Sequence, residues 1–481
     1  MNISLKKFLS NFSITLLANF ISMLVSSTAV LIIPAFIGVK EYGYWQLYVF
    51  YCSYTAYLSF GITDGVYIRN GGKKYDELNK SQIKAQYFVL LIMNVILTIA
   101  TFLFLLFFGN DVDKSIVLIL SFCSAIIIIP RSLLTMTLLA VNRIKENALI
   151  TIVDRLVYLS LIMIFLLFKI KSFYFLVIAD LIGQLVSSLL AIFLCKDIIF
   201  TKINNSISEI LKETKVNMTI GIKIVVAGLA SMLIVGIVRM GIEQNWGVEE
   251  FAKVSLTLSV CNILLIFIKA VSVVIFPLLC NSDNNVLNKI YIFSKDSLSI
   301  VLLGALVFYY PIKLVLSIWL PQYSDSLKYM AFLFPISLYE SKTQLLLNTY
   351  FKALRKENLL LLVNIITVLL SVVFSFISIE IMNSIDLAIF SIVLLLFIRC
   401  YISEFFLMRA LNLSDYINSF IEACVSLSFI LFNWTIGGIL GMLLYLLVYI
   451  LYLVLKRKEL KLIYANLKNQ ILKKDKGEIN V

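Results

Sequence analysis

Five basic side chains lie deep inside long apolar segments of this 481-residue chain: Arg131, Arg155, Lys269, Lys342 and Arg399. A charge at that depth in a bilayer is costly, so each should face protein or water rather than lipid. Guanidinium groups bind phosphate through two parallel hydrogen bonds, and ammonium groups bind it as point charges. The five cations therefore predict a pocket for a phosphate or pyrophosphate group.

The depth of these cations supports one shared pocket. Each lies about two to four residues from the middle of its apolar segment, always toward the same face, which is on the order of 2–6 Å at 1.5 Å per residue. Cations from five segments at one depth predict a positively charged layer around a central cavity.

Acidic residues in the same segments offer a second interpretation. Asp154, Asp180 and Glu340 are candidates for coupling transport to an ion. Internal pairing could instead explain some cations, above all Arg131 with Asp154, and both interpretations stay open. Neighbours in a helix point about 100° apart, so Asp154 and Arg155 should not pair with each other. Glu340 and Lys342, two residues apart, should also face different ways.

The sequence shows no pattern typical of a catalytic site or a metal site. The chain has no histidine, and its seven cysteines are scattered without a paired motif. We find no nucleophile with an adjacent base, no glycine-rich phosphate loop and no cluster of metal ligands. The sequence therefore predicts no catalytic residue, no metal site, no cofactor and no enzymatic activity.

The elements that carry these charges are membrane helices. Hydrophobic residues make up 61% of the chain and charged residues 14%, against about 25% charged in soluble proteins; the mean hydropathy is +0.98. This composition predicts an all-α polytopic membrane protein. The net charge of +13 then indicates anionic lipid headgroups as partners rather than nucleic acid.

Fourteen segments have about the 20 apolar residues that a membrane helix needs. The predicted spans are 13–37, 44–63, 86–108, 116–140, 148–168, 173–195, 219–240, 254–276, 297–318, 327–351, 359–379, 387–408, 416–432 and 434–455. With the N-terminus inside, the inner segments hold 27 Lys and Arg residues and the outer loops 5. This excess predicts that both termini are cytoplasmic.

Two short matches indicate an internal repeat. Gly38-Val39-Lys40-Glu41-Tyr42 is matched 209 residues later by Gly247-Val248-Glu249-Glu250-Phe251, and Lys145-Glu146-Asn147 is matched 211 residues later by Lys356-Glu357-Asn358. Six spans separate the copies, so the two halves have the same orientation and form a parallel repeat.

The repeat sets the predicted domain organisation. We expect an N-lobe (1–196, six spans), an amphipathic cytoplasmic linker (197–218), a C-lobe (219–410, six spans), two further spans (411–455) and a basic cytoplasmic tail (456–481).

Three stretches carry a resemblance to a known family: Pro34 with the following Gly38–Gly43 segment, the Gly61-Ile62-Thr63-Asp64-Gly65 turn with Arg69, and the stretch from Trp319 to Asn358. With its span pattern, the chain resembles the polysaccharide branch of the multidrug/oligosaccharidyl-lipid/polysaccharide (MOP) flippase superfamily, most closely the O-antigen flippases of Wzx type.

The resemblance implies two six-helix lobes around a cavity that opens alternately to each side. It implies a flippase that moves undecaprenyl-pyrophosphate-linked oligosaccharide, of the lipopolysaccharide O-antigen or capsule type, across the bacterial cytoplasmic (inner) membrane. A polysaccharide polymerase and a chain-length regulator are the protein partners that it implies. Related flippases hold the pyrophosphate with arginines, some in the first span; this first span is uncharged, so Arg131 and Arg155 would supply the N-lobe share.

Two other functions compete with this one. A drug or cation exporter of the same superfamily should have an acidic cavity, whereas the predicted spans here hold nine basic and five acidic residues. A glycan polymerase or ligase usually needs a large outer loop, and the longest predicted outer loop, 241–253, is short.

Overall fold

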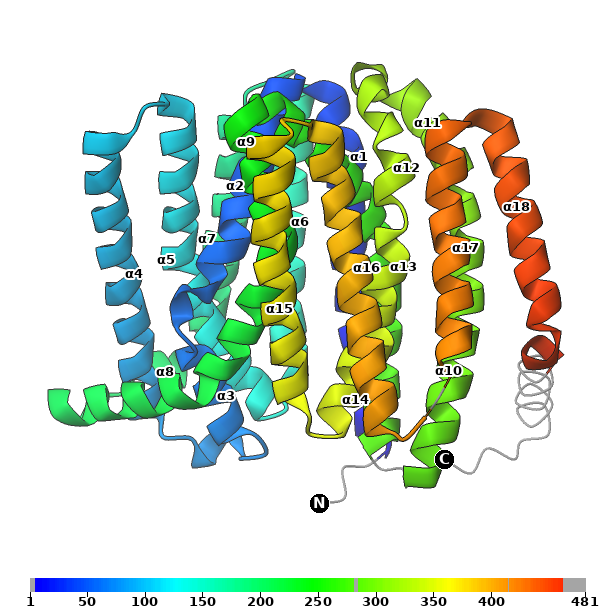
Figure 1. The fold of residues 1–481 in the computed structure, drawn as a ribbon. Helices are drawn as coiled ribbons and strands as arrows, with labels where there is room; N and C mark the ends of the chain where they lie inside the picture. Colours follow the sequence, from blue (N-terminus) through cyan, green and yellow to red (C-terminus); the bar gives the residue numbers. More distant parts are fainter. Residues whose placement is uncertain (1–4, 281–283, 414, 462–481) are drawn as a thin grey trace. The chain divides into compact units, whose positions relative to one another are not determined.

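The computed structural model describes the backbone of residues 5–280, 284–413 and 415–461, and the side chains of these residues except 5–16, 264–280, 284–287, 289 and 357 (Figure 1). All regular secondary structure in the described residues is helical. The predicted all-α class is therefore confirmed. By their contacts, the residues divide into two compact units.

Unit 1 comprises the residues up to Met232 together with Trp246–Ser255. Its helices are α1 (Leu5–Phe36), α2 (Val39–Thr55), α3 (Ile62–Asn70), α4 (Lys80–Phe108), α5 (Val112–Ala140), α6 (Ile144–Leu167), α7 (Phe173–Leu194), α8 (Lys196–Ile199) and the first part of α9 (Ile207–Cys280). Helix α5 is central, since it packs against α2, α3, α4, α6 and α7. Phe50 of α2 and Phe251 also pack edge to face, with ring centroids 5.6 Å apart.

Unit 2 comprises Leu233–Asn245 and the residues from Leu256 onward. Its further helices are α10 (Asn284–Ala305), α11 (Tyr309–Trp319), α12 (Met330–Leu333), α13 (Ile336–Lys342), α14 (Asn348–Ala353), α15 (Glu357–Ser375), α16 (Ile385–Ala410), α17 (Tyr416–Thr435) and α18 (Gly438–Leu455). The short helix α13 packs against α10 and α16, and α12 packs against α16 and α17. Much of the stretch from Trp319 to Asn358 is therefore buried in unit 2.

Eleven helices in the described residues are long and apolar enough to cross a membrane, so the predicted count of fourteen is not confirmed. Two predicted spans, 219–240 and 254–276, fall within α9. The predicted span 44–63 is not one helix: it starts inside the 17-residue α2 and continues into a 3-10 turn, Ala56–Ser59. The predicted span 327–351 is divided into α12, α13 and α14, because Pro335 precedes α13 and a π-helical turn, Thr343–Leu347, follows it.

Short polar residues begin several of these helices. The side chains of Asn79, Asp111, Ser172 and Ser384 each accept a hydrogen bond from a backbone N–H in the first turn of α4, α5, α7 and α16. Such caps satisfy N–H groups that have no partner within the helix. These four helices thus begin at a side-chain cap.

The two Lys-Glu-Asn copies adopt related local structures, whereas the two copies that begin with Gly38 and Gly247 differ, with φ −67° and 83° at these glycines. Before each Lys-Glu-Asn triplet one residue has a positive φ, 61° at Asn142 and 54° at Arg355. The residue that follows each of them donates its N–H to the carbonyl five positions back, at 2.8 and 2.7 Å. Each triplet therefore lies where one helix has ended and the next begins. Gly247, in the other repeat, has φ 83° and interrupts α9, a conformation that glycine adopts without steric cost.

The predicted linker 197–218 includes most of α8 and the start of α9. Ile207 and Leu211 on this part of α9 are 77% and 61% exposed, and Lys212 and Lys215 are exposed as well. The segment thus carries apolar and basic residues on its surface. The predicted lobe boundaries stay a prediction.

Candidate functional site

In unit 1, the predicted residues of α5 and α6 form an ion pair. Arg131 Nη1 lies 3.4 Å from Asp154 Oδ1, and it also donates a hydrogen bond to the Ser187 hydroxyl of α7. The pairing that the sequence left open is therefore present. The Arg131 side chain keeps 14% of its surface exposed.

Asp180 of α7 lies in a second set of polar contacts. It accepts hydrogen bonds from the Tyr48 hydroxyl at 2.9 Å and from the Gln184 amide at 2.5 Å. Gln184 in turn accepts a hydrogen bond from Ser124 of α5 at 2.8 Å. Residues from α2, α5 and α7 thus hold this carboxylate in place.

Arg155 differs from the other predicted cations of the described residues. It is half-buried, and it makes no hydrogen bond and no close ion pair with any side chain that the structure describes. Asp180 is near enough to interact with it electrostatically. Asp154, its neighbour in sequence, faces Arg131 instead, as helix geometry predicted.

In unit 2, Lys342 is at the centre of a buried cluster of charges. Its ammonium lies 2.8 Å from Glu404 of α16 and 2.7 Å from Glu422 of α17. The side chain is 2% exposed, and its Nζ is 5.4 Å from the centre of the Tyr401 ring. The sequence had not assigned Lys342 either of these acidic partners.

Lys295 of α10 belongs to the same cluster and was missed. Its ammonium lies 3.0 Å from Glu404 and 2.9 Å from Asp415, and it donates a hydrogen bond of 2.8 Å to Ser419. The predicted span began at residue 297, which left Lys295 in an inner loop. Helix α10 in fact begins at Asn284, so only the full length of this helix could have revealed the residue.

Arg399 and Glu340 form a third pair. Arg399 Nη1 lies 3.3 Å from Glu340 Oε2. Arg399 also donates a 3.0 Å hydrogen bond to Asn364, and Glu340 accepts a hydrogen bond of 2.8 Å from Gln344. Glu340 and Lys342 thus face different partners, as their spacing predicted. The side chain of Lys269 lies outside the described residues.

The charge of these groups limits what each can bind. Lys342 and Arg399 are both about 2% exposed, and acidic partners compensate them. The cluster around Lys342 contains two lysines and three carboxylates, so it has a small excess of acid. The unit 1 cations, Arg131 and Arg155, keep more access to the surface. Within the described part of the chain, no group of His, Cys, Asp or Glu side chains is arranged to hold a metal ion.

Comparison with solved structures identifies the fold. An inward-facing multidrug resistance MATE family transporter of the MOP superfamily matches with a TM-score of 0.61 and 13% identity, over 82% of this chain and 98% of its own. The lipid II flippase MurJ, in an inward closed conformation, matches with a TM-score of 0.58 and 13% identity, over 93% of this chain and 99% of its own. A MATE protein in complex with MaD3S matches with a TM-score of 0.57 and 14% identity, over 84% of this chain and 95% of its own.

No family model and no curated protein matches the sequence. The structural likeness shows that this chain has the fold of MOP superfamily transporters. The eleven long apolar helices of the described residues indicate a multi-pass membrane protein. At 13–14% identity it shows the fold alone.

Proposed function

We propose that this protein is a flippase that moves undecaprenyl-pyrophosphate-linked oligosaccharide repeat units, of the O-antigen or capsule type, from the inner to the outer leaflet. It works by alternating access in the bacterial cytoplasmic membrane, with both termini in the cytoplasm. It acts as a transporter and not as an enzyme. A polysaccharide polymerase and a chain-length regulator are its proposed protein partners.

The observation that carries this proposal is the environment of Arg155. A half-buried guanidinium in a membrane helix, without a close partner among the described side chains, favours an anionic ligand. Arg131 adds a second, partly exposed guanidinium in the same unit. Arg131 and Arg155 are therefore the leading pyrophosphate contacts, and the paired Lys342 and Arg399 are secondary candidates.

The extent of the structural match also supports a lipid-linked substrate. The lipid II flippase aligns with 93% of this chain, whereas the two MATE structures align with 82% and 84%. More of this chain thus has a counterpart in a protein named for moving a lipid.

A groove in unit 2 offers a place for the lipid chain. It has a volume of about 1,000 Å³, and α11 and the ends of α10 and α18 line it with mostly apolar residues, including Phe308, Leu314 and Ile439. These three side chains are well exposed, and Lys313 is the single cation among the lining residues. We assign this groove to the polyprenyl chain of the substrate, since its exposed apolar side chains can pack along a long apolar chain.

One observation favours a second function, a multidrug or cation antiporter. The cluster around Lys342 has more carboxylates than lysines, and an excess of acid suits a cationic substrate. The MATE likeness, with a TM-score of 0.61, agrees with this alternative.

Reconstitution into liposomes tests the proposal. With a fluorescent lipid-linked oligosaccharide, we expect wild-type protein to flip the lipid and Arg155→Ala to lose most of this activity. Arg409→Ala, an exposed arginine at the end of α16, is the matched control and should keep it. Thermal unfolding checks that both variants are folded.

Two results would contradict the proposal. Flipping by Arg155→Ala at the wild-type rate would remove its main support. Export of a cationic dye, together with no flipping of any lipid-linked glycan, would favour the antiporter.

A further inference from the structure

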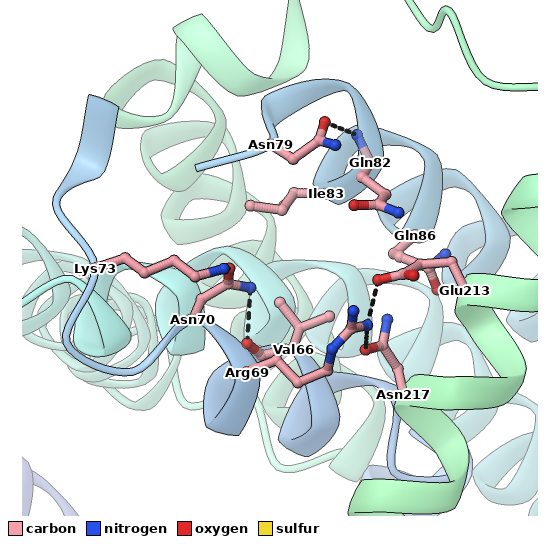
Figure 2. Close-up of a pocket in the computed structure, with 10 residues that line it drawn as sticks. All are labelled: Val66, Arg69, Asn70, Lys73, Asn79, Gln82, Ile83, Gln86, Glu213 and Asn217. Carbon is pink, nitrogen blue, oxygen red and sulfur yellow. Dashed lines mark hydrogen bonds and ion pairs between the residues drawn. The ribbon is translucent and has the colours of Figure 1, made fainter. Parts of the chain in front are cut away.

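A small polar pocket in unit 1 shares no lining residue with the charged groups described above. Helices α3 and α4 and the start of α9 form it, and ten residues line it (Figure 2). Figure 2 shows Asn79, Gln82 and Ile83 across from Arg69 and Asn70, with Glu213 and Asn217 of α9 at one side. The pocket is thus built from parts of the chain that are distant in sequence.

Arg69 is fixed at one wall of this pocket. It donates hydrogen bonds to Glu213 and, at 2.8 Å, to Asn217 Oδ1. Its side chain remains 36% exposed. Both recorded bonds use Nη1, whereas guanidinium carries five N–H donors, so donors remain for a ligand.

Asn217 supplies the second observation. The residue is 1% exposed, and its Nδ2 has no hydrogen-bond partner among the described residues. A buried amide donor without a partner costs free energy, and a ligand oxygen would satisfy it. Because Arg69 occupies its Oδ1, the amide can offer only a donor to this ligand.

Charge and size then indicate the chemistry of the ligand. Arg69 and Lys73 bring two positive charges and Glu213 one negative charge, so the lining has a net positive charge. The volume is about 60 Å³, which is room for about four waters at roughly 15 Å³ each. A tetrahedral phosphate group fits a site of this size that is rich in donors.

We propose that this pocket binds a phosphate group, carried by an anionic phospholipid headgroup or free in solution. Arg69 supplies the planar guanidinium and Asn217 a buried amide donor. Lys73 supplies an ammonium, which also donates a 2.9 Å hydrogen bond to Asn70. The proposal goes beyond the transport function, because none of these residues belongs to the proposed substrate site.

The surroundings of the pocket are suited to a lipid source. On α9, which supplies Glu213 and Asn217, the exposed apolar residues Ile207 and Leu211 and the exposed Lys212 are close in sequence. Such a segment lies in the interfacial layer, where phospholipid headgroups are concentrated.

Equilibrium binding to the purified full-length protein in detergent tests the proposal with three probes. They are dihexanoyl phosphatidylglycerol, dihexanoyl phosphatidylcholine and inorganic phosphate. We expect the glycerol lipid to bind, phosphate to compete with it, and the choline lipid to bind more weakly because its cation meets a positive pocket. Binding of phosphate alone would assign the site to the free anion.

Two variants connect binding to the pocket. Asn217→Asp keeps the acceptor for Arg69 but replaces the free donor with a carboxylate oxygen, and Lys73→Glu reverses an exposed charge. Each should weaken binding about tenfold or more, because a charge-assisted hydrogen bond is lost and a repulsion gained. Lys74→Glu changes the exposed neighbour that does not line the pocket, and it should change binding less than about twofold.

Three results would overturn the proposal. One is wild-type protein that binds neither the glycerol lipid nor phosphate. Another is equal binding of the glycerol and choline lipids, which would indicate apolar contacts. The third is wild-type affinity in both pocket variants while thermal unfolding shows them folded.

Discussion

Lys456, directly after α18, is buried and forms an ion pair of 2.6 Å with Asp296 of α10. The neighbouring Lys295 pairs with Glu404 of α16 and with Asp415, which precedes α17. Two consecutive residues of α10 thus connect it to the segments that follow in the chain. Removing one partner of a buried pair leaves an uncompensated charge.

We therefore expect Lys456→Met to destabilise the protein by about 3–5 kcal/mol. Lys458→Met removes an exposed lysine nearby, and it should change stability by less than about 1 kcal/mol. Thermal unfolding in detergent, followed by intrinsic fluorescence, measures both. Equal stability of the two variants would show that the Asp296 pair contributes nothing.

The Lys342 cluster predicts a non-additive effect on stability. Lys342→Met leaves Glu404 and Glu422 buried with one cation fewer, so it should lower the unfolding temperature and the protein level. Adding Glu422→Gln to that variant should recover part of the loss, because it removes one buried negative charge. Lys328→Met, at an exposed pair with Asp386, is the control. If the change in stability of the double variant equals the sum of the changes in the two single variants, Lys342 and Glu422 are not coupled.

The contact between α3 and α9 predicts a steric effect. A Cβ added at Gly221 would lie 2.0 Å from the backbone oxygen of Gly61, whereas one at Gly38 would meet nothing within 4 Å. Gly221→Ala should therefore reduce stability by about 1–3 kcal/mol through overpacking, and Gly38→Ala should be tolerated. Unfolding midpoints and expression levels of the two variants decide this. A stable Gly221→Ala variant would mean that the helices can separate at no cost.

Single-cysteine labelling tests the proposed topology. In a cysteine-free background, residues 145, 356 and 458 should be inaccessible to an impermeant reagent in intact cells, and residues 114 and 325 should react. Permeabilised cells provide the control, since all exposed positions should then react. Labelling of residue 356 in intact cells would refute the orientation.

The driving force of transport is a further prediction. The chain has no GxxxxGK[ST] motif, so we expect flipping without ATP. A pyrophosphate lipid with roughly two negative charges would gain on the order of 4–5 kcal/mol in moving outward through 100 mV. Liposomes with an imposed potential, positive on the acceptor side, should therefore flip faster. If only a proton or sodium gradient has an effect and Glu340→Gln removes it, Glu340 is the coupling residue instead.

Helix geometry explains what the sequence could predict about the site. The pairing of Arg131 with Asp154, and the different directions of Glu340 and Lys342, follow from residue spacing and depth within helices. Partners from distant helices do not follow from these rules. Lys342 contacts Glu404 and Glu422 because α13, α16 and α17 pack together, and this packing depends on the shapes of many apolar side chains.

Span assignment was limited for a similar reason. Hydropathy identifies long apolar helices such as α4 and α5, but it does not separate a lipid-facing helix from a buried one. The stretch from Met330 to Phe351 is apolar because it lies in the core of unit 2. There, neighbouring helices support breaks near Pro335 and at the π-helical turn.

The contact between Phe50 and Phe251 has a consequence for how the protein is made. Unit 1 includes Trp246–Ser255, so α2 emerges from the ribosome long before the segment that covers its Phe50 ring. Until that segment follows, this part of α2 lacks a native neighbour and remains available to insertion factors or quality-control proteases. A nascent chain that stops at the predicted linker would therefore leave the first unit without the segment that contacts Phe50.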